Sequence, residues 1–118
     1  TSALLNGRTI LLVEDVPLIA LDLAQMLKSA GAHVLLANTL EEAKLLAEHD
    51  ELACALLDHS LSDGTCAEIY ARLDERGVPF VIHSGLTDVA GIPAGAPLLL
   101  KPATERSLLA ALECLIGE

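Results

Sequence analysis

The sequence predicts an α/β domain in which helices cover both faces of a parallel sheet. Short apolar stretches alternate five times with segments of helical spacing, an order typical of strands joined by right-handed crossovers. Residues 53–57 are apolar at every position, as expected for a strand that is buried on both faces. The 118 residues are enough for one domain with a proper core.

The first half of the chain contains two strand–helix pairs. Pro17 suits the first turn of the first helix, and Gly31 ends that helix. Thr39 and Glu42 have the spacing of a capping box and start the second helix. We expect a flexible lead-in over residues 1–7, with the domain covering 8–118, and then a strand over 8–13, a helix over 17–30, a strand over 33–37 and a helix over 39–49.

The second half continues the alternation with one interruption. Gly77 ends a helix, and Thr104 caps the last one. Residues 86–96 hold two Gly and one Pro, so we expect a short or irregular fourth helix there. The other elements are a strand over 53–58, a helix over 66–76, a strand over 78–83, a strand over 98–100 and a final helix over 104–116.

Composition limits the functions that this chain can have. With one Tyr, one Phe and no Trp, the core must be aliphatic, and an aromatic platform for stacking nucleic-acid bases is excluded. The net charge of -10 argues against binding of nucleic acid or of an anionic membrane surface by this chain. The same charge suits a domain that holds a divalent cation or meets a basic partner.

Cysteine usage and hydropathy indicate a cytoplasmic location. Cys54, Cys66 and Cys114 show neither a CxxC motif nor a histidine spacing suited to zinc, which favours reduced thiols. No apolar run reaches the length of a membrane span, and no signal peptide is visible.

Polar side chains stand at the carboxyl ends of four predicted strands. In a parallel sheet these ends share one edge, which is where such sheets bind ligands. Acids that meet there repel one another unless a cation neutralises them, and an all-oxygen ligand set suits Mg²⁺. A Lys and a Ser suit the oxygens of a phosphoryl group. The residues are Glu14 and Asp15, Asp58, Ser84, and Lys101.

This set of residues predicts phosphoryl transfer, in which positioning and charge neutralisation do most of the work. Asp58 is the candidate nucleophile and would form an aspartyl phosphate. Asp15, Asp58 and the backbone carbonyl of Ser60 are the candidate metal ligands, and Glu14 would act mainly through metal-bound water. The side chains left to contact phosphoryl oxygens are Ser84 and Lys101.

Four short motifs follow one another in a familiar order: LLVED ending at Asp15, LLD ending at Asp58, HSG around Ser84, and LLLKP with Lys101. With them the sequence resembles the receiver domains of two-component response regulators, from residue 8 to about residue 116. The resemblance implies a flavodoxin-like fold with strand order 2-1-3-4-5. It also implies phosphotransfer to Asp58 from a histidine kinase or a histidine phosphotransfer protein, in a signalling switch that catalyses only its own phosphorylation and slow dephosphorylation.

The sequence departs from most receivers at two positions. Ser62 stands where most have a Pro, four residues after the phosphorylated Asp. Leu98 stands where most carry the Tyr or Phe that rotates as a switch, three residues before the Lys. The chain thus resembles the divergent receivers that are attached to hybrid histidine kinases or stand alone.

Two alternatives remain beside a phosphorylated receiver. A docking module that signals without phosphate is favoured by the missing aromatic and Pro, and disfavoured by the intact acids, Ser84 and Lys101. A phosphatase with an aspartate nucleophile needs a second acid two residues later, where this chain has Ser60.

Residues beside these motifs carry expectations of their own. His83 should point away from Ser84, because neighbours along a strand face opposite sides, and should pack or be partly exposed. His59 is expected to face solvent. Leu18 and Leu21 lie outside the buried stripe of the first helix and are either a docking surface for a partner helix or scattered surface leucines.

Overall fold

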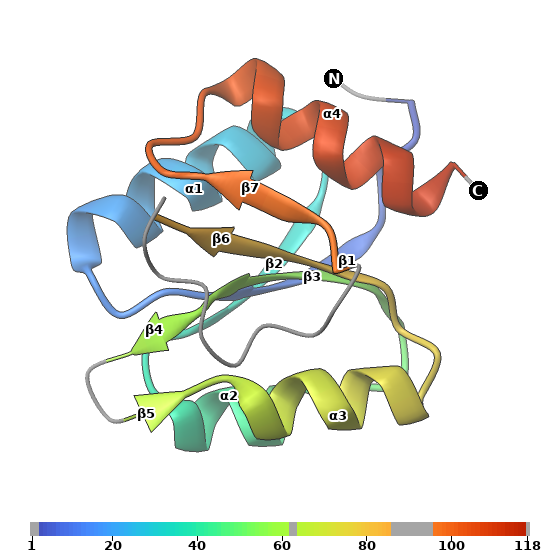
Figure 1. The fold of residues 1–118 in the computed structure, drawn as a ribbon. Coiled ribbons are helices and arrows are strands. Elements are labelled where there is room, and N and C mark those ends of the chain that lie inside the picture. The colour runs from blue at the N-terminus through green and yellow to red at the C-terminus, as the bar shows by residue number, and fades with distance from the viewer. Residues whose placement is uncertain (1–2, 62–63, 86–95, 118) are drawn as a thin grey trace.

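A five-stranded parallel sheet forms the middle layer of the structure (Figure 1). The computed structural model describes residues 3–61, 64–85 and 96–117. The strand order β2-β1-β3-β6-β7 confirms the predicted order 2-1-3-4-5, and every neighbouring pair is parallel. The strands are β1 (Thr9–Val13), β2 (His33–Ala37), β3 (Leu52–Asp58), β6 (Phe80–Ser84) and β7 (Leu98–Leu100).

Helices cover both faces of this sheet, with α1 and α4 on one side and α2 and α3 on the other (Figure 1). Strand β1 shows why its sequence is apolar at successive positions. Ile10 and Leu12 belong to the core beneath α1 and α4, whereas Leu11 and Val13 belong to the core beneath α2 and α3. The helices are α1 (Pro17–Ser29), α2 (Leu40–Leu46), α3 (Ala67–Glu75) and α4 (Glu105–Ile116).

Helix ends follow the predicted signals, with one helix shorter than expected. Pro17 opens α1, and Gly31 follows its end with a φ of 95°, which favours glycine. Thr39 caps α2 by accepting a hydrogen bond from the Glu42 backbone N–H at 3.1 Å. Helix α2 ends at Leu46, earlier than the predicted end at residue 49. Beyond it, the backbone N–H groups of Glu48 and His49 each donate to a carbonyl three residues back, so the chain continues in single turns.

Two local features differ from the sequence predictions, and one prediction concerns residues outside the described ranges. Leu5 is fully buried and Gly7 N donates to Gly31 O at 2.9 Å, so the described part of the lead-in packs onto the domain. Strands β4 (Ser60–Leu61) and β5 (Gly64–Thr65) form a small antiparallel pair that was not predicted. The predicted short or irregular fourth helix over 86–96 lies almost wholly outside the described residues.

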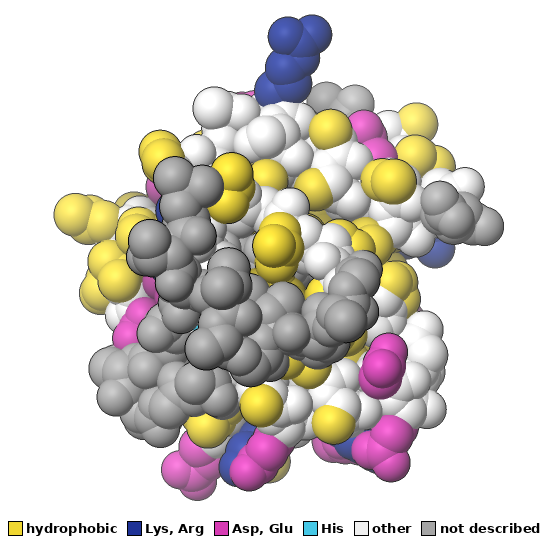
Figure 2. All heavy atoms as spheres, viewed as in Figure 1, with side chains coloured by type: hydrophobic (Ala, Val, Ile, Leu, Met, Phe, Trp, Pro, Cys, Tyr) yellow, Lys and Arg dark blue, Asp and Glu magenta, His cyan; other side chains and the backbone are white. Residues whose placement is uncertain are grey.

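The surface combines exposed leucines with ion pairs. Figure 2 shows hydrophobic side chains over the β7 edge of the sheet, where Leu98 and Leu100 are half exposed. Acidic and basic side chains gather over α2 and α3, which are joined by Lys44–Glu68 and Arg72–Glu48 ion pairs. None of the helices in the described ranges has the length and apolar character of a membrane span.

Candidate active site

Three acidic side chains meet at the carboxyl edge of the sheet, as their places at strand ends predict. Glu14 and Asp15 follow β1, and Asp58 ends the neighbouring strand β3. One carboxylate oxygen from each residue lies within 4.8 Å of the others. Glu14 and Asp58 are buried, and Asp15 is partly exposed. Carboxylates this close together and partly buried repel one another, so their charge is unfavourable unless a cation or a bound proton offsets it.

Lys101 supplies one positive charge to this edge. Its Nζ donates a hydrogen bond to Asp58 Oδ1 at 2.9 Å. The residue follows β7, and its backbone N–H donates to Ser84 O at 3.0 Å, which fixes the start of this turn against β6. The Lys101–Pro102 peptide bond is cis. The sheet therefore brings together an acid and an ammonium group that are 43 positions apart.

Burial and the neighbouring charges shift the two acids in opposite directions. Burial raises the pKa of Asp58 to about 6, with the Lys101 hydrogen bond opposing the shift and Glu14 adding to it. For Glu14, burial also acts upward, but His83, Asp58 and the Val16 N–H together hold its pKa below the ordinary value. Burial lowers the pKa of Lys101, yet the hydrogen bond to Asp58 and the charges of Asp58, Glu14 and Asp15 together outweigh it, and the net shift is upward. The ammonium therefore stays charged beside Asp58.

The two predicted serines lie at the same edge. Ser84 is buried at the end of β6, and its hydroxyl donates to Gly85 O at 3.0 Å. Ser60 lies in β4, two residues after Asp58, and its backbone pairs with Thr65 of β5. Ser84 thus lies on the strand beside β3, which ends in Asp58, and Ser60 lies two residues after Asp58 in the chain. The contact of Ser84 with a phosphoryl group and of the Ser60 carbonyl with a metal stay predictions.

The expectation that His59 faces solvent is wrong. His59 is only 2% exposed, and its Nδ1 lies 2.8 Å from the Tyr70 hydroxyl of α3. Its ring also stacks on Tyr70, with centroids 6.0 Å apart. The two-residue period of a strand explains this position, because His59 follows Leu57 on the side that packs against α3. The alternation of side chains along β3 was therefore the signal in the sequence that could have predicted a buried position for His59.

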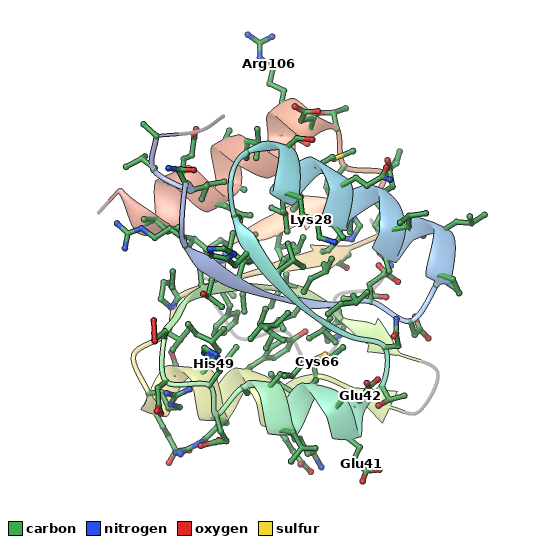
Figure 3. All side chains as sticks on the ribbon, turned by 180° about the vertical axis from the view of Figure 1, so that it is seen from behind. Lys28, Glu41, Glu42, His49, Cys66 and Arg106 are labelled. Carbon is green, nitrogen blue, oxygen red and sulfur yellow. The ribbon has the colours of Figure 1, made fainter. Side chains whose placement is uncertain are left out.

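His83 is packed as predicted and also approaches the acids, which sequence reasoning did not foresee. The side chain is buried, and its Nδ1 lies 3.8 Å from Glu14 Oε1. Cys66 approaches from the other side of the sheet, where it lies between α3 and the strands (Figure 3). Its Sγ donates to the Asp58 backbone carbonyl at 3.1 Å. The candidate nucleophile is therefore enclosed by packed side chains.

Comparison with solved structures identifies the family. A scan of protein-family models and a search of curated proteins found no match to this sequence. The receiver domain of a sensor histidine kinase from Pseudomonas aeruginosa, solved with magnesium in its active-site cleft, is 27% identical with a TM-score of 0.86, over 95% of this chain and 99% of that one. SdrG from Sphingomonas melonis is 30% identical with a TM-score of 0.79, over 92% and 96% of the two chains.

A third structure, a CheY-like response regulator receiver domain from Methanospirillum hungatei, is 25% identical with a TM-score of 0.84, over 95% of each chain. The chain is a response regulator receiver domain. This family acts in two-component signalling, where receivers interact with histidine kinases or phosphotransfer proteins. In this receiver the predicted motifs all lie at the carboxyl edge of the sheet, around Asp58.

Proposed function

We propose that this receiver accepts a phosphoryl group on Asp58 from a phosphohistidine on a histidine kinase or histidine phosphotransfer protein. The observation that carries the proposal is the convergence of Glu14, Asp15 and Lys101 on Asp58. An aspartate held between acids and an ammonium group suits a reaction that needs positioning and charge neutralisation rather than a separate acid or base. The result is a signalling switch that changes partner interactions, rather than a metabolic enzyme.

The acids fit a magnesium ion. Carboxylate oxygens within 4.8 Å of one another are hard ligands, and Mg²⁺ prefers such ligands while keeping several waters. We propose that Asp15, Asp58 and the Ser60 backbone carbonyl bind the ion, with Glu14 acting through a metal-bound water. When bound, Mg²⁺ neutralises the acids and the negative charge that develops on the phosphoryl oxygens.

The chain's own residues provide the rest of the reaction. The Asp58 carboxylate attacks phosphorus, the N–P bond of the phosphohistidine breaks, and the imidazole leaves with the electron pair. Lys101 balances charge on the acyl phosphate oxygens, and the Ser84 hydroxyl donates a hydrogen bond to one of them. Water later hydrolyses the aspartyl phosphate and returns the switch to its resting state. A donor of this kind is consistent with a cytoplasmic location.

A second candidate function is docking without phosphate. One observation favours it: Leu98 of β7 takes the place of the aromatic switch, and its side chain is 47% exposed. A leucine at the sheet edge has no hydroxyl or ring that could turn toward a phosphoryl group. In this alternative the fold presents a constant surface, and Asp58 plays no part in signalling.

Intact-mass spectrometry separates the two functions. The chain is incubated with acetyl phosphate, with and without Mg²⁺, beside Asp58→Asn and the control Asp74→Asn, which changes an exposed acid on α3. We expect one phosphoryl group to add to the wild type and to Asp74→Asn, only with Mg²⁺, and none to add to Asp58→Asn.

A receiver that takes phosphate only from its partner protein would give no mass gain. Fluoroberyllate, which mimics the acyl phosphate, is then titrated while backbone NMR signals are recorded. Shifts at Asp58 and Ser84 would support the phosphorylated receiver. A spectrum without shifts, together with no mass gain, would overturn it in favour of docking without phosphate.

A further inference from the structure

Helix α3 fixes the residue that stands between two of the proposed metal ligands. His59 follows Asp58 and precedes Ser60 in the chain. The hydroxyl of Tyr70 in α3 lies 2.8 Å from His59 Nδ1, and the two rings stack with their centroids 6.0 Å apart. Tyr70 stacks in turn on Phe80 of β6, with centroids 5.3 Å apart. His59 and Tyr70 are both buried, so the His59 side chain cannot turn without breaking packed contacts.

A second contact from α3 holds the peptide group that joins Asp58 to His59. Its carbonyl accepts a hydrogen bond from Cys66 Sγ at 3.1 Å, and its N–H donates to His83 O at 3.3 Å. Cys66 is fully buried at the start of α3, between this helix and the strands (Figure 3). Because a peptide group is planar, contacts to its C=O and its N–H together fix the orientation of its plane. Cys66 and Tyr70, named the α3 clamp below, thus hold both the backbone and the side chain that lead from one proposed ligand to the next.

The position of a backbone ligand depends on contacts of this kind. A carbonyl oxygen has no side-chain torsions of its own, so the backbone around Ser60 sets where its oxygen lies. The α3 clamp holds the chain that leads into Ser60, and Ser60 itself pairs with Thr65 of β5. Mg²⁺ requires near-ideal octahedral geometry with short bonds, whereas Ca²⁺ accepts longer bonds and irregular geometry. A carbonyl that is held in place therefore favours Mg²⁺, and one that is free to shift does not.

The charge of the acidic cluster cannot make this distinction between two ions of equal charge. Its three carboxylate oxygens lie within 4.8 Å of one another and attract either divalent cation, so the choice between them depends on geometry. We propose that the α3 clamp makes this site selective for Mg²⁺ over Ca²⁺, with Cys66 and Tyr70 as positioning residues for the Ser60 carbonyl. The inference rests on the magnesium site of the proposed function and adds residues that act behind its ligands. Contacts that orient a ligand in this way change the affinity of a metal site.

The test compares the dissociation constants of Mg²⁺ and Ca²⁺, each measured by titrating the metal-free chain with MgCl₂ or CaCl₂ and recording backbone NMR signals. Tyr70→Phe removes the hydroxyl that holds His59 and keeps the stacked ring. We expect it to weaken Mg²⁺ binding about tenfold and to change Ca²⁺ binding much less. Ile69→Val is the matched control, because it removes a methyl group from the same core beside Tyr70 and should bind both ions as the wild type does. A loss of stability alone leaves the dissociation constants of a folded chain unchanged, so the ratio between the two ions reports positioning.

The second half of the clamp is tested by a pair of variants. Cys66→Ala removes the group that donates to the Asp58 carbonyl and should lose the preference for Mg²⁺, whereas Cys66→Ser keeps a donor there and should retain more of it.

The outcomes separate the clamp from the magnesium site. If the wild type prefers Mg²⁺ and both Tyr70→Phe and Cys66→Ala keep its ratio of dissociation constants, the clamp is overturned while the magnesium site stands. The clamp is also overturned if the wild type binds Ca²⁺ as tightly as Mg²⁺. If MgCl₂ gives no saturable shifts at Asp15 and Asp58 of the wild type, the magnesium site of the proposed function fails, and the positioning role fails with it.

Discussion

Lys101 Nζ donates a hydrogen bond to Asp58 Oδ1 across 2.9 Å, although β6 separates their two strands in the sheet. The carboxylate is 2% exposed and the lysine side chain 31% exposed. Asp58 therefore has a partly solvated cation on one side and buried Glu14 on the other. The cation favours ionisation of Asp58, whereas burial and Glu14 oppose it, so the balance between them governs both reactivity and stability.

Replacing the lysine should slow phosphorylation of Asp58. In Lys101→Met the cation is lost, so the pKa of Asp58 rises further and less of it is ionised at neutral pH. We expect the rate of labelling by acetyl phosphate with Mg²⁺ to fall at least about tenfold, because the ammonium group also no longer balances the charge on the phosphoryl oxygens in the transition state. Intact mass against time measures this rate.

Lys28→Met is the matched control, because Lys28 is an exposed lysine in the last turn of α1 (Figure 3). It should label at the wild-type rate. If Lys101→Met also labels at that rate, the contact with Asp58 has no role in the reaction.

Removing the Asp58 charge should stabilise the metal-free fold at neutral pH. Its pKa is about 6 in the folded state and 3.8 ordinarily, so between these values the folded state keeps a proton that the unfolded state has lost. The raised pKa of Asp58 therefore contributes fully to the free energy of unfolding of the wild type below pH 3.8, and this contribution is lost as the pH rises through about 6. We expect Asp58→Asn to raise the free energy of unfolding at neutral pH by about 2 kcal/mol.

Urea unfolding at several pH values between 4 and 8 measures this difference. The advantage of Asp58→Asn over the wild type should be smallest at pH 4, grow as the pH rises to the folded pKa of about 6, and level off above it. A difference that stays constant with pH would show that Asp58 is not the group responsible.

Magnesium should stabilise the folded domain through the acidic cluster. A ligand that binds only the folded state adds about 2.7 kcal/mol at one hundred times its dissociation constant. We expect the melting temperature to rise with MgCl₂ in the wild type and in Asp74→Asn, and to rise much less in Asp15→Asn. An equal rise in Asp15→Asn would place magnesium binding elsewhere on this acidic chain.

The sequence contained most of the fold because apolar strands alternate with helical segments, and polar residues stand at the carboxyl ends of four of the five strands. The carboxyl ends of parallel strands coincide, so Asp15, Asp58, Ser84 and Lys101 could be placed on one edge without knowledge of any contact. The small β4–β5 pair could not be foreseen, since strands of two residues are too short to show an alternating pattern.

Contacts across the layers were also beyond sequence reasoning. The approach of His83 to Glu14 depends on the packing of β6 and β1 around β3, which no local pattern encodes. A cavity beside Lys101 likewise arises where α1, β6 and a turn meet. Strand periodicity could have placed His59 inside, but its polar neighbours favoured a turn facing solvent.

The buried pair formed by His59 and Tyr70 should contribute to stability. Tyr70→Phe removes the hydroxyl that lies 2.8 Å from His59 Nδ1, and keeps the ring that stacks on Phe80 with centroids 5.3 Å apart. Because the imidazole then loses this partner in a buried position, we expect the free energy of unfolding to fall by about 1 to 2 kcal/mol. Urea unfolding at neutral pH measures it.

A double-mutant cycle separates the hydrogen bond from packing. His59→Leu alone should destabilise the domain by leaving the Tyr70 hydroxyl without the imidazole. The combination of His59→Leu with Tyr70→Phe should then cost less than the sum of the two single changes, because both partners have been replaced by apolar groups. If the two losses simply add, the hydroxyl and the imidazole do not interact, and the pair is held only by the stacking of its rings.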